Sequence, residues 1–182
     1  GALGAARTGG ISNRKRLSSG LQFYIVQRGV YVDSTLNIAL ERINKQLTYN
    51  TVVNRPGISD DIDALASFRE KVFLKEEKEF TKKDTLQFNS LRSKVDLYNI
   101  DSLAKVEYEN MTKKYDFPEG RREVYKTIGG TPHLDQSYTV FGQVVKGMDV
   151  VDSIAVVKTN KAGKPLNDVR IISAKMIKRI LY

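Results

Sequence analysis

The 182-residue sequence contains no cysteine, no tryptophan and a single histidine, His133. Without cysteine there can be no disulfide scaffold, no thiol nucleophile and no thiolate-bound metal. A single histidine excludes a multi-histidine metal site and argues against a serine–histidine–aspartate triad. We therefore expect no metal and no cofactor, and only chemistry that needs neither.

Long apolar runs are missing as well. No stretch reaches the roughly 18 apolar residues that a bilayer span requires. The glycine- and alanine-rich first six residues are too short for a secretory signal and run directly into Arg7. Because 41% of the residues are nevertheless hydrophobic, we expect a folded, soluble protein without a membrane span.

Positive charge exceeds negative charge, with 30 lysines and arginines against 21 aspartates and glutamates, a net charge of +9. The excess lies almost entirely outside residues 30–117, where the two signs nearly balance. Basic flanks could neutralise the phosphates of a nucleic acid. No aromatic stacking motif accompanies them, so the sequence favours solvated surface charge and no nucleic-acid partner.

The two flanks carry strand patterns. Short runs of aromatic and β-branched residues, bounded by glycine and serine, predict strands at 21–26, 138–145 and 169–177. A short helix is predicted from Met148 to Ile154, because apolar residues there recur at helical spacing.

The middle of the chain has a helical period instead. Apolar residues from Leu36 to Leu47 step by three or four positions, and similar stripes follow the break at Pro56 and Gly57. We expect a helical insertion over 30–117 between two parts of one β-rich domain, 1–29 and 118–182.

Several sequence blocks in the flanks stand in the order and spacing of a known family. They are GALGAAR at 1–7, SSGLQFYI at 18–25, TIGGTPHLD at 127–135, YTVFG at 138–142 and GMDVVD at 147–152. Together they resemble the cyclophilin family of peptidyl-prolyl cis–trans isomerases. The tail PLNDVRI at 165–171 is similar to the last strand of that family.

This resemblance implies a mainly β fold with an α insertion, built as a cyclophilin-like antiparallel β-barrel plus a helical subdomain. The barrel is expected to be partial. The family carries a Phe-His-Arg segment, whose arginine is the main catalytic group, upstream of these blocks, and no such segment occurs here. The chain thus looks like the C-terminal part of a bacterial-type cyclophilin, with the N-terminal half absent.

The implied reaction is rotation about an X–Pro bond, which twists an amide against a barrier of about 18–20 kcal/mol. It needs an apolar pocket for the proline ring and donors that favour the twisted amide. The resemblance assigns a catalytic role to Gln22, which would bond to the substrate or orient the arginine. It assigns substrate binding to Ala6, Arg7, Tyr24, His133, Leu134 and Tyr138.

Each assignment has a structural alternative, since Tyr24 and Leu134 can be core residues and Gln22 can satisfy a neighbouring backbone group. The leading hypothesis is an isomerase that assists folding of proline-containing polypeptides, weakly active as an isolated chain because the arginine is absent. The alternative is a non-catalytic, chaperone-like polypeptide-binding module. Both the bacterial cytoplasm and the periplasm fit the sequence. The unpaired edges of a partial barrel predict association with a second copy or with the missing half.

Overall fold

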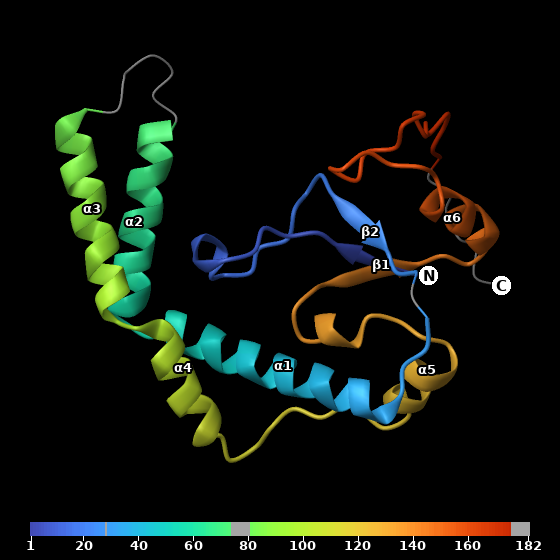
Figure 1. Cartoon of the computed structure of the whole chain (residues 1–182), viewed down its shortest axis with the longest axis horizontal. Helices are drawn as coiled ribbons and strands as arrows, with labels where there is room; N and C mark the ends of the chain where they lie inside the picture. The colour runs from blue at the N-terminus through green and yellow to red at the C-terminus, as the bar shows by residue number, and fades with distance from the viewer. Residues whose placement is uncertain (28, 74–80, 176–182) are drawn as a thin grey trace.

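Six α-helices and one three-stranded sheet form the regular structure of residues 1–27, 29–73 and 81–175, the parts that the computed structural model describes (Figure 1). The helices are α1 (Asp33–Val53), α2 (Ile58–Phe73), α3 (Lys82–Leu97), α4 (Ile100–Glu109), α5 (Arg121–Thr127) and α6 (Met148–Ala155). The strands are β1 (Ala2–Ala5), β2 (Phe23–Ile25) and β3 (Val140–Gln143), and the 3-10 turns are η1 (Ile11–Asn13) and η2 (Pro132–Leu134).

The sheet is antiparallel, with strand order β2-β1-β3. Gly4 at its centre lies opposite Tyr24 on one side and Val140 on the other, and the register with β3 shifts at a bulge between Leu3 and Gly4. The strands predicted near 21–26 and 138–145 therefore lie in one sheet, with β1 between them. Within the described residues this sheet is open and does not close into a barrel.

The expectation of a mainly β chain is wrong, because helices make up most of the regular structure. The predicted strand at 169–177 is absent over 169–175, and its last two residues lie outside the described part of the chain. A β-strand forms only where a neighbour pairs its backbone groups. No described segment pairs with 169–175, so its neighbouring apolar residues Ile171 and Ile172 are left exposed.

The predicted helices of the middle segment are confirmed, and α1 packs with its first half beneath the η2–α5 region (Figure 1). Its buried residues Leu36 and Ile43 share a core with Phe117 and Tyr125. The side chain of Asn44 binds the backbone of Tyr115 twice, accepting from its N–H at 2.7 Å and donating to its carbonyl at 3.0 Å.

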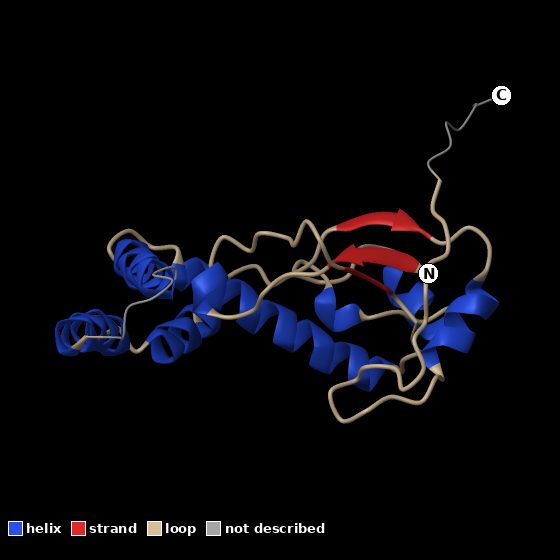
Figure 2. Ribbon diagram, turned by 90° about the horizontal axis from the view of Figure 1, so that it is seen from above, coloured by secondary structure: helices blue, strands red, loops and turns tan. Residues whose placement is uncertain are grey.

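A second core joins α1, α2 and α4 around Val52, Ile62 and Ala104. The chain turns between α1 and α2 at Gly57, whose φ of +83° favours glycine, and this agrees with the predicted break. Helices α2 and α3 lie side by side, set apart from the sheet at the far end of α1, as Figures 1 and 2 both show.

The loop between β1 and β2 is fastened to this helical part. The guanidinium of Arg14 forms a two-pronged ion pair with Asp63 of α2, and its Nη1 donates to Asn54 at 2.7 Å. Ile11 of the same loop packs against the second core. The division of the chain into a β-rich domain (1–29 and 118–182) and a helical insertion (30–117) stays a prediction. The contacts of Arg14 and Ile11 join these two parts.

Candidate functional site

A cavity of about 1170 Å³ lies between one face of the sheet, the η2 turn and α5. Tyr24 of β2, Leu134 of η2 and Tyr138 line it together, although they come from segments far apart in the sequence. The rings of Tyr24 and Tyr138 meet edge to face, with centroids 5.8 Å apart and planes at 85°. This arrangement is typical of stabilising aromatic pairs. Two tyrosines and a leucine thus form an apolar wall.

Gly4 of β1 allows Tyr24 to take this position. A Cβ at Gly4 would lie 2.4 Å from Cζ of Tyr24, closer than any real contact, so only glycine leaves room for the ring. Burial, followed by the nearby hydroxyl of Tyr138, raises the pKa of Tyr24. The ring therefore stays neutral near neutral pH and suits an apolar ligand.

Two arginines stand beside the tyrosines. The guanidinium of Arg7 lies over the Tyr138 ring, 4.9 Å from its centroid. Arg16, which lines the cavity, donates from its Nη2 to the carbonyl of Gln136. Both side chains are half-buried. The apolar wall therefore has hydrogen-bond donors at its rim.

Asp135 holds the opposite wall in place. It accepts hydrogen bonds from the hydroxyls of Tyr125 at 2.7 Å and Tyr115 at 3.3 Å, and pairs with Arg121 at 3.2 Å. Burial and the bond to Asp135 raise the pKa of Tyr125 far above its usual value. Gly130 lies so close to the Tyr125 ring that a Cβ would approach it to 2.8 Å. This network fixes the loop that carries Leu134.

The structure places the remaining assigned residues near the cavity but not in its wall. The backbone N–H of Ala6 donates to the carbonyl of Gln22 at 3.0 Å, and the Gln22 side chain is exposed. His133, on η2, is half-buried. None of the three lines the cavity, whereas Tyr24, Leu134 and Tyr138 do. The catalytic role of Gln22 stays a prediction.

Sequence reasoning missed Gly4, Asp135 and Arg16 as parts of this site. A glycine inside a strand signals a close approach of another group, and this signal was available for Gly4. An aspartate directly after the matched leucine gave no comparable sign. Arg16 looked like one member of a basic loop, and only the folded chain brings it to the cavity.

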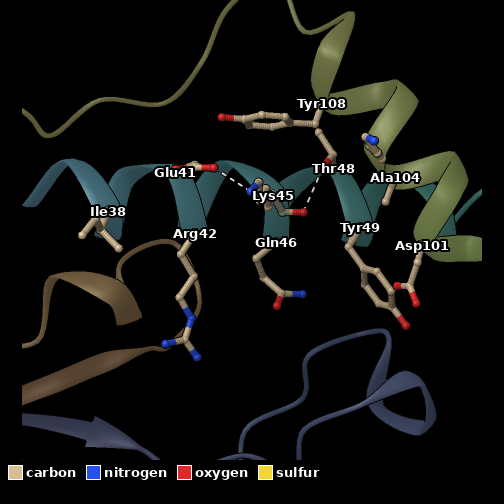
Figure 3. Close-up of a pocket in the computed structure, with 11 residues that line it drawn as sticks. Ile38, Glu41, Arg42, Lys45, Gln46, Thr48, Tyr49, Asp101, Ala104 and Tyr108 are labelled. Carbon is tan, nitrogen blue, oxygen red and sulfur yellow. Dashed lines mark hydrogen bonds and ion pairs between the residues drawn. The ribbon is translucent and has the colours of Figure 1, made fainter. Parts of the chain in front are cut away.

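A second cavity, of about 490 Å³, lies between α1 and α4 (Figure 3). Long charged side chains line it, and Glu41 pairs with Lys45 at 2.6 Å across one turn. Tyr49 and Asp101 face each other in Figure 3, and burial, together with that carboxylate, raises the pKa of Tyr49. Tyr49 and Tyr108 line this cavity too, but it is less than half the size of the cavity beside the sheet, and none of the residues assigned from the sequence lines it. The cavity beside the sheet is therefore the candidate site.

Within residues 1–27, 29–73 and 81–175, no group of three or more histidine, cysteine, aspartate or glutamate side chains could hold a metal ion. No described helix combines the length and apolar character needed to cross a membrane.

Comparison with known proteins supports the resemblance. Residues 111–176 match the sequence model of the family described as cyclophilin type peptidyl-prolyl cis-trans isomerase/CLD. A putative peptidyl-prolyl cis-trans isomerase of Staphylococcus saprophyticus is 43% identical over 61 residues, covering 34% of this chain and 31% of that protein. A similar protein of Staphylococcus aureus is 44% identical over 57 residues, 31% of this chain and 29% of its own length.

A eukaryotic protein is similar to this chain over a stretch of comparable length. Peptidyl-prolyl cis-trans isomerase-like 1 of Aspergillus fumigatus is 40% identical over 55 residues, 30% of this chain and 34% of its own. The chain thus spans about a third of the length of these relatives. The predicted resemblance to cyclophilins is confirmed, while its first blocks, at 1–25, lie outside the residues that the family model matches. No solved structure matches the chain.

Proposed function

We propose that this chain, whose residues 111–176 belong to the cyclophilin-type peptidyl-prolyl isomerase family, binds X–Pro segments of polypeptides and acts on their cis–trans equilibrium. One observation carries the proposal. Leu134 and Tyr138, within the matched residues, share an apolar cavity with Tyr24 from the far end of the sequence.

The proposed mechanism needs binding and electrostatics only. The pyrrolidine ring packs against Tyr24, Leu134 and Tyr138, and the peptide on either side crosses the rim. Rotation moves the amide out of its resonance plane, and a donor at the rim favours the twisted form over both planar forms. Arg7, held over the Tyr138 ring with its guanidinium 4.9 Å from the ring centroid, is the proposed donor.

We expect residues 1–182 by themselves to turn over slowly. The sequence holds no Phe-His-Arg segment, and one well-placed donor contributes about 10²–10³ in rate. For the same reason we keep the second candidate, a chaperone-like module that binds polypeptides without turnover. Gln22 is the proposed catalytic partner of an arginine, and Ala6 and His133 are proposed peptide contacts.

The proposal extends to the architecture. Residues 1–29 and 118–182 form the cyclophilin-like portion of a barrel, and 30–117 form a helical subdomain inserted into it. The open sheet is covered by a further polypeptide, either a second copy or the remaining part of a cyclophilin fold. Proline-containing proteins are the partners, and the basic flanks serve solubility and not nucleic-acid binding.

Exchange NMR on an Ala-Pro peptide, with and without residues 1–182, tests the activity. We expect a small but measurable rise in the interconversion rate, which the Leu134→Ala change abolishes. The control Leu166→Ala, at a side chain that is 64% exposed, leaves the rate unchanged. Binding without any rise in rate would favour the non-catalytic module, and absence of binding would overturn the proposal.

A further inference from the structure

The charges around the cavity beside the sheet are unequal. Two carboxylates line it, and both already have donors: Asp135 pairs with Arg121, and Asp152 accepts from the side-chain amide of Gln27 at 2.6 Å. The amide of Gln27 is neutral, so Asp152 keeps its charge, but among the described residues neither carboxylate forms an ion pair with Arg7 or Arg16. The remaining charged side chains on the cavity wall are basic.

Apart from Lys15, which is exposed, the described cations at this cavity without an ion pair are Arg16 on its wall and Arg7 beside it, over the Tyr138 ring. Among the described residues neither forms an ion pair with a carboxylate. The Nε atoms of both are shielded from solvent and have no hydrogen-bond partner in the described chain. A buried donor without an acceptor is costly, more so on a charged group.

The two guanidiniums also repel each other. Both lie along the segment that ends at Tyr138: Arg7 over its ring and Arg16 on the carbonyl of Gln136. Burial and the charge of Arg7 lower the pKa of Arg16. Arg16 also has a φ of 58°, a left-handed conformation that residues other than glycine rarely adopt. An anion between the two would relieve the repulsion and supply the missing acceptors.

We propose that Arg7 and Arg16 form an oxyanion subsite at the rim of the cavity, which selects X–Pro segments that carry an acidic group beside the proline. This rests on the proposed function and names its substrate class. Planar guanidinium groups recognise carboxylate and phosphate oxygens through paired N–H donors. The anion sits at the arginines while the pyrrolidine ring packs against the tyrosines.

Calorimetric titration of residues 1–182 with matched peptides tests this. The central dipeptides are Glu-Pro, Gln-Pro, phosphoserine-Pro, Ser-Pro and Glu-Ala, in otherwise identical sequences. We expect Glu-Pro to bind about tenfold or more tightly than Gln-Pro, because hydrogen bonds to charged groups are stronger than those between neutral groups. The phosphoserine arm tells whether phosphate serves as well as carboxylate, and preference for either supports the subsite.

Variants locate the effect. Arg16→Gln removes the Glu-over-Gln preference while Gln-Pro binding persists. Arg7→Gln also removes the preference, and it weakens the binding of both peptides because Arg7 is itself a proposed substrate contact. Arg16→Lys keeps the positive charge but loses the planar pair of N–H donors, so we expect it to retain only part of the Glu-over-Gln preference. Lys146→Gln, which removes an exposed charge outside the cavity, leaves the preference intact.

The outcomes separate the two proposals. Equal binding of the Glu-Pro, Gln-Pro, Ser-Pro and phosphoserine-Pro peptides overturns the oxyanion subsite and leaves proline recognition standing. Equal binding of Glu-Pro and Glu-Ala overturns proline recognition and leaves the subsite standing. A preference that survives both arginine changes places the anion elsewhere and also overturns the subsite.

Discussion

At the scale of single residues, the site depends on how closely the Tyr24 ring approaches the β1 backbone at Gly4. The Gly4→Ala change would set a methyl group 2.4 Å from Cζ of that ring, so the ring must leave the cavity wall. We expect proline-peptide affinity to fall about tenfold or more, since a displaced aromatic ring loses roughly 1.5–3 kcal/mol of apolar contact. Titration of the two proteins measures the change.

The same sheet supplies the control for this change. A Cβ at Gly142 would meet Leu3 at 3.7 Å, an ordinary contact. The Gly142→Ala variant should therefore bind the peptide as the unchanged chain does. Equal affinity of all three proteins would show that the position of the Tyr24 ring does not matter for binding.

A second residue-scale prediction concerns Asp135, which accepts from two tyrosines and pairs with Arg121. The Asp135→Asn change keeps the shape but removes the charge and replaces one acceptor oxygen with a donor. We expect the free energy of unfolding to fall by about 1.5–3 kcal/mol, the range for hydrogen bonds to charged groups. Urea unfolding followed by circular dichroism measures it.

Asp168→Asn is the matched control, because Asp168 pairs with Arg170 on the exposed surface, where ion pairs contribute about 0–1 kcal/mol. If both variants lose the same small amount, Asp135 does not organise the wall.

At the scale of elements, α2 and α3 are joined through Asp61, which accepts from Lys94 at 2.6 Å and from the hydroxyl of Tyr98 at 2.5 Å. These bonds lower the pKa of Asp61 below its usual value. Their stabilisation is therefore present above the unfolded pKa, about 3.9 for aspartate, and is lost as the pH falls through the lower folded pKa.

We expect Asp61→Asn to lower the melting temperature at pH 7, with the difference shrinking as the solution is acidified below pH ~4. Asp96→Asn, at an exposed carboxylate 3.6 Å from Arg92, serves as the control and should change little at any pH. A difference between Asp61→Asn and the unchanged chain that persists undiminished in acid would contradict the assigned ion pair.

Elements also show how far the sequence could predict the structure. Helical spacing is a local pattern, and the helices from α1 to α4 and α6 follow it. A strand forms only when a neighbouring strand pairs with it, so the residue pattern at 169–175 could not by itself predict one. The tyrosine wall could be anticipated from the cyclophilin-like blocks, whereas Arg16 could not, because its place depends on a loop that Arg14 fastens to α2.

At the scale of the whole molecule, the sheet face opposite Tyr24 is open. Phe23 and Phe141 meet edge to face there, with centroids 6.2 Å apart, yet are 57% and 59% exposed. Exposed strand edges and apolar faces favour pairing with another chain. We expect light scattering to show association that grows with protein concentration, and replacement of both phenylalanines by serine to suppress it.

The double replacement should leave the helical circular dichroism unchanged, since neither ring belongs to the two cores. A strict monomer at every concentration, before any replacement, would contradict the expected association.

The central claim is that the cavity beside the sheet binds an X–Pro segment, and chemical-shift mapping tests it most directly. Backbone and methyl resonances of residues 1–182 are followed while an Ala-Pro peptide, and separately its Ala-Ala counterpart, is added. The account predicts shifts that centre on Tyr24, Leu134 and Tyr138 with the proline peptide and are absent with the other. Shifts centred on the α1–α4 cavity, or equal shifts with both peptides, would contradict it.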